Sequence, residues 1–234
     1  MRVLAIGHQR DAGPGVFGEA VTAAGDELEL WWIAESAEPP RDLEAYDAVM
    51  TFGGAMNVDD EDRHPWLGPE KGLLAELLER DTPLLGVCLG SQLVSAAAGG
   101  SPQRASEPEI GWFEIEVTGE GAVDPLLAGL EPSFEAFEWH SYQCGAPESA
   151  SVLACTPVCG QAFRFGPAAW GIQFHPEVTP QIAEDWIDDY RSDADAVRIG
   201  VDPEALRAAT RKRLDAQMTL GADLCSRFLA EARR

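Results

Sequence analysis

The sequence predicts an α/β fold with a mostly parallel central sheet flanked by helices, short antiparallel strands and a C-terminal helical extension. Three observations predict this architecture. Short apolar strands alternate with helical segments over the first hundred residues, which favours parallel strands between layers of helices. Short strand patterns separated by turns follow between residues 112 and 174. From Pro180 onward the apolar residues recur at helical spacing.

The N-terminal half contains four expected strands and three expected helices. Apolar runs rich in β-branched residues predict buried strands at 2–7, 28–33, 48–52 and 83–87. Apolar residues at helical spacing predict helices at 15–24, 66–80 and 91–98. Glycines follow several of these segments, where the chain must turn.

The second half begins with five short expected strands, at 112–117, 134–139, 151–155, 161–165 and 169–174. They fit either a separate antiparallel lobe or edge strands of the same sheet. Helices are expected at 181–190 and 203–232, with Asp202 as an N-cap and Pro203 in the first turn. We expect residues 1–190 to form one domain and residues 191–234 a helical extension packed on it, joined by a mobile segment at 192–195.

Composition and charge exclude several classes of function. The 234 residues are 45% hydrophobic and 24% charged, as in ordinary globular proteins, and the formal charge is −23. This charge argues against nucleic-acid binding and against an anionic membrane surface, because both partners attract basic patches. No apolar run approaches the ~20 residues of a membrane span, and no signal-peptide pattern is visible. A cytoplasmic location is therefore expected.

The cysteines give no clear metal or disulfide pattern. The odd count of five, without a secretion signal, indicates free thiols, at Cys88, Cys144, Cys155, Cys159 and Cys225. A zinc site at Cys155 and Cys159 is the alternative, but a closed zinc site needs four ligands. No further ligand pair lies beside these two cysteines, so we predict neither a metal nor another cofactor.

The strongest local signal is the segment Gly86-Val87-Cys88-Leu89-Gly90-Ser91-Gln92, between an expected strand and an expected helix. In this context G-x-C-x-G is typical of a nucleophile elbow, a sharp turn that exposes the nucleophile. The positive end of the helix dipole favours a thiolate at Cys88. The backbone N–H of Leu89 is then directed where an oxyanion would form. A buried cysteine at a strand end is the alternative interpretation.

A nucleophilic cysteine needs a base, and His175 is the best candidate among His8, His64, His140 and His175. An apolar strand is expected to end at His175, which would place its ring at the edge of the sheet. Glu177 lies two residues further on, and extended residues two apart point the same way. Its carboxylate would orient the imidazole toward the thiol, completing a triad. No role is predicted for His8, and His64 is expected in a solvated acidic loop.

Together the two motifs resemble those of the class I glutamine amidotransferases, the triad type found in GMP synthetase, anthranilate synthase and carbamoyl phosphate synthetase. The elbow resembles the family's G-[IV]-C-x-G-x-Q, and residues 171–177 (GIQFHPE) resemble its G-x-Q-F-H-P-E. The resemblance covers about residues 1–190. It implies a flavodoxin-like sheet similar to a stand-alone glutaminase domain of GMP synthetase. It also implies Cys88 as nucleophile, His175 as general base and acid, and Glu177 as the orienting carboxylate.

The resemblance extends to the oxyanion hole and the substrate pocket. Residues 52–56 (FGGAM) match the glycine-rich oxyanion strand of the family, which makes the N–H of Gly54 the partner of that of Leu89. The family usually has proline at Ala55, which affects the stiffness of the loop but not its amide. The implied contacts to substrate are Met56, Gln92, Ser141 and Tyr142.

Three functions are compatible with these motifs. The first is a glutamine amidotransferase that gives glutamate and ammonia, passing the ammonia to a separate ATP-dependent synthetase, since no G-x-x-x-x-G-K-[ST] loop is present. The second is a free-standing γ-glutamyl hydrolase with the same triad. The third is a non-catalytic regulatory module, which the intact triad disfavours. The sequence does not identify the ammonia acceptor or the oligomeric state.

Overall fold

The fold is built on nine strands, and the computed structural model describes all residues from Met1 to Arg234. The strands are β1 (Arg2–Gly7), β2 (Glu27–Trp32), β3 (Ala48–Thr51), β4 (Leu84–Val87), β5 (Gln103–Val117), β6 (Ser133–Gln143), β7 (Ser151–Cys155), β8 (Gly160–Phe165) and β9 (Ala169–Ile172). They form one sheet in the order β2-β1-β3-β4-β9-β8-β7-β5-β6. The first five strands in this order are parallel, and from β9 to β6 each neighbouring pair is antiparallel. The short strands therefore extend the same sheet, and the predicted α/β fold is confirmed.

Six α-helices accompany the sheet: α1 (Gly15–Ala23), α2 (Leu67–Glu79), α3 (Leu89–Ala97), α4 (Pro180–Asp188), α5 (Ala194–Ile199) and α6 (Pro203–Ala232). Three short 3₁₀ turns lie between them, at η1 (Leu43–Ala45), η2 (Gly121–Val123) and η3 (Tyr190–Ser192). None of the helices combines the length and the apolar character that crossing a membrane requires.

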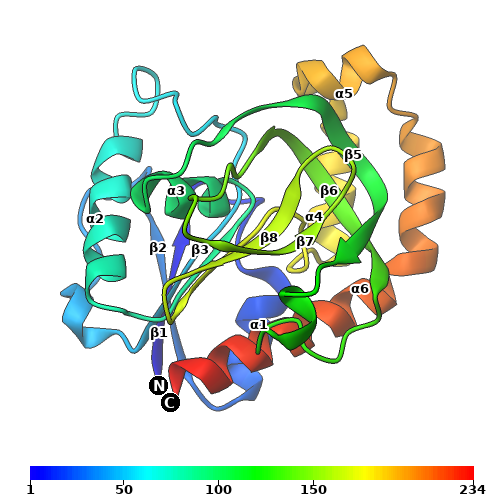
Figure 1. The fold of residues 1–234 in the computed structure, drawn as a ribbon. Coiled ribbons are helices and arrows are strands. Elements are labelled where there is room, and N and C mark those ends of the chain that lie inside the picture. Colours follow the sequence, from blue (N-terminus) through cyan, green and yellow to red (C-terminus); the bar gives the residue numbers. More distant parts are fainter.

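Side-chain alternation along the parallel strands divides the interior into two layers. Val3 and Ala5 of β1 face a core shared with α1 and α6, whereas Leu4 and Ile6 face a core shared with α2 and α3. Because successive residues of a strand point to opposite faces, one short apolar strand supplies both layers. Figure 1 shows α2 and α3 on one side of the parallel strands and α1 with α6 on the other.

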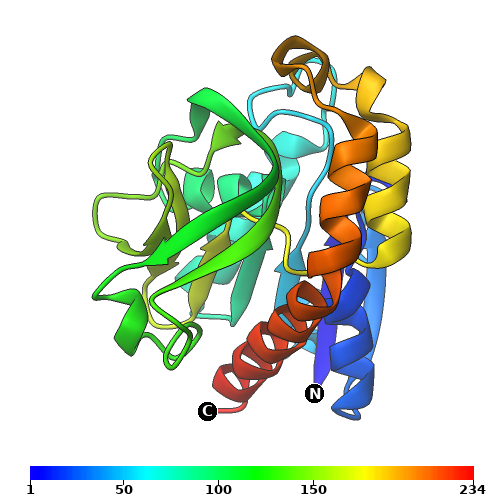
Figure 2. The ribbon, with the colours of Figure 1, turned by 90° about the vertical axis from the view of Figure 1, so that its right-hand side faces the viewer.

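The long helix α6 packs along α1 and contributes to the main core. Phe228 of α6 meets Trp170 of β9 edge to face, with ring centroids 6.1 Å apart. The two ends of the chain lie at the same end of the molecule, as Figures 1 and 2 show. Asp26 joins them, since it accepts hydrogen bonds from the Met1 ammonium at 2.8 Å and from Arg233.

Several expected boundaries were wrong for identifiable reasons. The strand expected at 112–117 begins at Gln103. Gln103, Arg104 and Glu109 pair with the end of β6 through the backbone, which no apolar pattern in the sequence reveals. The strand expected to reach Phe174 ends at Ile172. The mobile segment expected at 192–195 instead contains the start of α5. There the Asp193 side chain accepts hydrogen bonds from the amides of the first helical turn.

Candidate active site

Cys88 occupies the sharp turn between β4 and α3. Its φ of +51° is a left-handed value, which is strained for a residue with a side chain. Glycines allow the turn to pack: a Cβ on Gly90 would lie 2.1 Å from the Thr51 carbonyl oxygen, and one on Gly86 would lie 2.5 Å from that of Gly90. The strained position and the close backbone contacts are the features of a nucleophile elbow.

His175 and Glu177 form a buried hydrogen-bonded pair beside this turn. His175 Nδ1 lies 2.8 Å from Glu177 Oε1, and both residues are at most 2% exposed. Both lie after β9 has ended, so a turn brings them together and not the strand alternation that the sequence suggested. Two further contacts fix the backbone of His175: its N–H donates to the Phe137 carbonyl at 2.9 Å, and its carbonyl accepts from Gln217 of α6 at 2.7 Å.

The other ring nitrogen of His175 is available to Cys88. Its Nε2 is buried and has no hydrogen-bond partner. A Cβ built on Gly53 would lie 3.3 Å from His175 Cε1 and 3.8 Å from Cys88 Cβ, so both side chains border the same glycine. Burial opposes a charged imidazole, but the Glu177 carboxylate and Cys88 together raise the pKa of His175 well above its usual value. This environment favours an imidazolium beside the sulfur.

Two backbone amides are candidates for an oxyanion hole. Leu89 is the first residue of α3, so no carbonyl one turn earlier in the helix accepts its N–H. Gly54 belongs to the loop after β3, and its N–H donates to no protein acceptor. The two residues are neighbours, since a Cβ on Gly54 would lie 3.2 Å from Leu89 Cδ2. Both line the same cavity as Cys88 and His175.

That cavity has a volume of about 430 Å³, in the range of small-molecule sites. It opens at the carboxyl ends of the parallel strands, where α/β folds bind their ligands. All four predicted substrate contacts line it: Met56, Gln92, Ser141 and Tyr142. Gln92 Nε2 donates to the Tyr142 carbonyl at 3.3 Å, which joins α3 to β6 along this wall.

Comparison with known proteins identifies the family that the sequence motifs resemble. The family model of the class-I glutamine amidotransferases matches residues 18–188. The chain belongs to the class-I glutamine amidotransferase family. It is 26% identical to the glutamine amidotransferase-like protein YfeJ of Salmonella typhimurium, over 79% of each chain. It is 36% identical to one subunit of the glutamine-hydrolyzing GMP synthase of Ignicoccus hospitalis, over 60% of this chain and 71% of that one.

A solved structure extends the similarity to the C-terminal region of this chain. The crystal structure of a glutamine amidotransferase from Thermotoga maritima superposes with a TM-score of 0.88 at 27% identity, covering 98% of each chain. The shared architecture therefore includes the helices that follow the family match.

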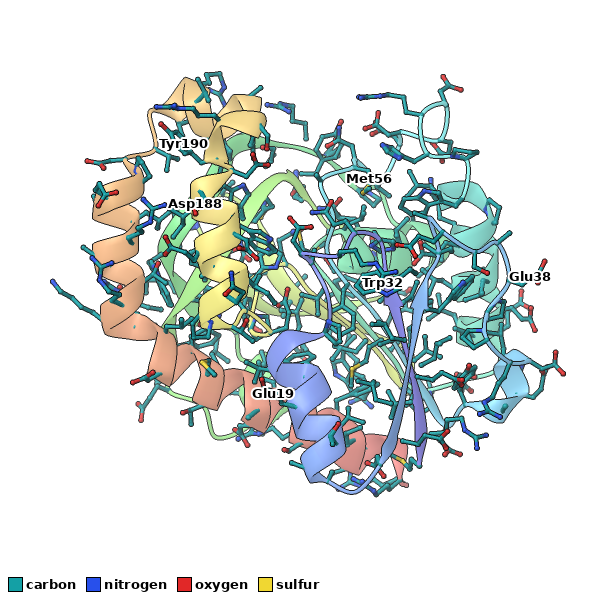
Figure 3. The ribbon with its side chains drawn as sticks, turned by 180° about the vertical axis from the view of Figure 1, so that it is seen from behind. Glu19, Trp32, Glu38, Met56, Asp188 and Tyr190 are labelled. Carbon is teal, nitrogen blue, oxygen red and sulfur yellow. The ribbon has the colours of Figure 1, made fainter.

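Helix α4 and the segment after it supply a wall of the cavity that the sequence did not predict. Trp186 stands edge-on to the His175 ring, with centroids 4.7 Å apart. Residues of η3 and the start of α5 also line the cavity, as does Arg104 of β5. Figure 3 shows Met56 and Tyr190 at the same end of the molecule. We expected a mobile segment at 192–195, so neither the N-cap role of Asp193 nor its place in the cavity wall was predicted.

A buried polar cluster lies behind Ser141 and involves one of the two cysteines considered for zinc. Ligand atoms of Glu109, His140 and Cys159 lie within 4.8 Å of one another, without Cys155. Glu109 Oε2 already accepts hydrogen bonds from Gln161 at 2.8 Å and from the Thr156 hydroxyl at 3.1 Å. Burial disfavours a charged His140, yet Glu109 and Glu138 raise its pKa to about 10. His140 Nε2 also lies 3.3 Å from Glu109 Oε2 and 3.2 Å from Glu138 Oε2, so two buried carboxyl groups flank its ring.

Proposed function

We propose that this chain hydrolyses the side-chain amide of L-glutamine to glutamate and ammonia, with Cys88 as nucleophile. One observation carries the proposal: His175 is bonded to Glu177 through Nδ1, while its unpartnered Nε2 lies beside Cys88 at the strained turn. Membership of the class-I glutamine amidotransferase family supports the choice of substrate.

In the proposed reaction the Cys88 thiolate attacks the side-chain amide carbon of glutamine. The N–H groups of Gly54 and Leu89 stabilise the resulting oxyanion. His175 gives its Nε2 proton to the departing nitrogen, so the C–N bond breaks, ammonia leaves and a γ-glutamyl thioester remains. His175 then takes a proton from water, whose oxygen attacks the thioester and releases glutamate and the thiolate. Glu177 keeps the imidazole oriented throughout.

We propose further that the ammonia passes to an acceptor activated by a separate ATP-dependent chain. One finding supports this: the relative from Ignicoccus hospitalis is named as one subunit of a glutamine-hydrolyzing synthase.

A γ-glutamyl hydrolase is the second candidate, because it would use the same triad. The observation in its favour is that residues 189 and 192–195, beyond the family match, line the cavity. They add lining to the cavity outside the family match, and a γ-glutamyl peptide needs such additional contacts for the residue attached to the amide nitrogen.

The two candidates are separated by measuring glutamate release by the purified chain from L-glutamine and from a panel of γ-glutamyl dipeptides. Cys88→Ala is the control in both arms. Cys88-dependent turnover with a higher kcat/KM for glutamine supports the amidotransferase. A higher kcat/KM for the dipeptides identifies the hydrolase. Turnover of neither substrate, by the chain alone or with a synthetase added, would overturn both.

A further inference from the structure

His8 is a buried histidine at the end of β1 whose two ring nitrogens are both engaged. Its Nδ1 lies 3.1 Å from the Gly53 carbonyl oxygen, and its Nε2 lies 2.9 Å from Glu70 Oε2. The side chains of His8 and Glu70 are fully buried. The ring also stacks on Trp66, with centroids 5.1 Å apart and planes 10° apart. Glu70 is held in turn, because Oε1 accepts from the Thr51 hydroxyl at 2.8 Å.

These partners determine the protonation of the ring. A carbonyl oxygen only accepts, so Nδ1 of His8 must donate to Gly53. Burial opposes the charge, but Glu70 and the Gly53 carbonyl raise the pKa of His8. These contacts favour an imidazolium that pairs with Glu70 and lies beside the loop that follows β3.

The contact with Gly53 fixes the direction of the next amide. The chain has no cis peptide bond, and in a planar trans peptide the C=O and the following N–H point in opposite directions. With the Gly53 carbonyl directed toward His8, the Gly54 N–H points away from His8. This N–H has no protein acceptor, and Gly54 lines the cavity with Cys88. The peptide on the far side is also held, because the Ala55 N–H donates to Gln9 Oε1 at 2.8 Å.

We propose that His8, backed by Glu70, is a positioning residue that holds the Gly53–Gly54 peptide with its N–H facing the Cys88 site. Glycines have broad conformational freedom, so a loop with two of them needs such a constraint to present one orientation. His8 and Gln9 thereby hold the two peptide groups that flank Gly54. The inference rests on the proposed amide hydrolysis and names a device that serves it.

Two substitutions of His8 test its contacts with Gly53 and with Glu70 one at a time. The amide nitrogen of an asparagine at this position reaches about where Nδ1 lies, so His8→Asn keeps a donor to Gly53 and loses the contact with Glu70. The longer His8→Gln reaches toward Glu70 and loses the donor to Gly53. Both remove the charge. His64→Asn is the control, because His64 touches the same Trp66 ring from the loop and does not line the cavity.

We expect His8→Gln to lower kcat for glutamine by at least tenfold with KM nearly unchanged, because loss of an oxyanion donor costs about 10²–10³ in kcat. His8→Asn should stay within a few-fold of the native chain. Alkylation of Cys88 by iodoacetamide, which needs the thiolate but no oxyanion hole, should match the native rate in both. Equal kcat losses in the two variants, or parallel losses of kcat and alkylation, would overturn the proposal.

A second measurement does not depend on turnover. The ¹H–¹⁵N signal of the Gly54 amide should shift in His8→Gln and remain near its native position in His8→Asn. Unchanged Gly54 signals in His8→Gln would refute the positioning role even in an active enzyme. If the native chain hydrolyses no glutamine while these shifts occur as expected, the proposed function fails and the positioning of Gly54 by His8 stands.

Discussion

The hydroxyl of Ser141 donates a hydrogen bond to Asp195 Oδ2 at 2.6 Å, joining β6 to the C-terminal helical segment across one wall of the cavity. Arg104 of β5 and Arg198 of α5 donate to the same carboxylate, at 2.5 Å and 3.0 Å. Burial favours the neutral acid, but these three hydrogen bonds lower the pKa of Asp195. An ionised Asp195 is thus the point where three elements of the cavity wall meet.

Removing this carboxylate should weaken substrate binding more than it slows the chemistry. A hydrogen bond to a charged group contributes ~1.5–3 kcal/mol, so we expect Asp195→Ala to raise KM for glutamine about tenfold while kcat changes less than threefold. Steady-state kinetics measures both. Asp202→Ala is the control, since it removes a carboxylate at the start of another helix, outside the cavity. An unchanged KM in Asp195→Ala would show that the wall does not order the substrate.

Glu177→Gln tests the orientation of His175. The amide cannot stabilise the imidazolium as the carboxylate does, so kcat should fall by about 10²-fold or more. Because Glu177 raises the pKa of His175, the imidazolium should be lost at lower pH in the variant, moving the alkaline limb of kcat/KM downward. A pH–rate profile checks this. The exposed substitution Glu184→Gln should leave the profile unchanged, whereas identical limbs in Glu177→Gln and the native chain would contradict the assigned role.

The glycines of the elbow should tolerate no side chain. A Cβ on Gly90 would clash with the Thr51 carbonyl at 2.1 Å, so Gly90→Ala should destabilise the fold by about 1–3 kcal/mol or more. A Cβ on Gly72, inside α2, would meet no atom within 4 Å, and Gly72→Ala should stabilise the fold by about 0.5–1 kcal/mol. Urea denaturation gives both values. Equal effects at the two positions would mean that the elbow is looser than the structure indicates.

The buried His140 network predicts a dependence of stability on pH. The pKa of His140 is raised from 6.5 to about 10 by Glu109 and Glu138, although burial opposes the charge. The resulting stabilisation is complete below pH 6.5 and is lost as the pH rises through about 10. Relative to His140→Gln, the native chain should therefore lose Tm between pH 7 and pH 10. A Tm difference that stays constant over this interval would show that His140 does not carry the charge.

The sequence predicted those parts of the site that depend on local pattern. The elbow around Cys88 lies between a strand and a helix within seven residues, and His175 and Glu177 are two positions apart, so their relation follows from short-range geometry. The partners of Ser141 and Arg104 lie 54 and 91 residues away. No spacing rule connects such positions, because only the packing of the C-terminal helices brings them together.

His8 illustrates a different limit of sequence reasoning. It is a lone histidine at a strand end, and its importance depends on Glu70, 62 residues later, and on one peptide of a glycine loop. The extended pattern at 169–174 was also misleading, since the strand ends at Ile172. There the His175 backbone bonds to Phe137 of β6, and Pro176, which lacks an N–H, follows it.

The covalent step at Cys88 is tested most directly by intact-mass spectrometry of the chain, acid-quenched during turnover of L-glutamine and digested to locate any adduct. We expect a γ-glutamyl group on the peptide that contains Cys88, absent without glutamine and absent in Cys88→Ala, which should release no glutamate. Glutamate release that persists in Cys88→Ala, or an acyl group on any other residue, would contradict the assignment of Cys88 as nucleophile.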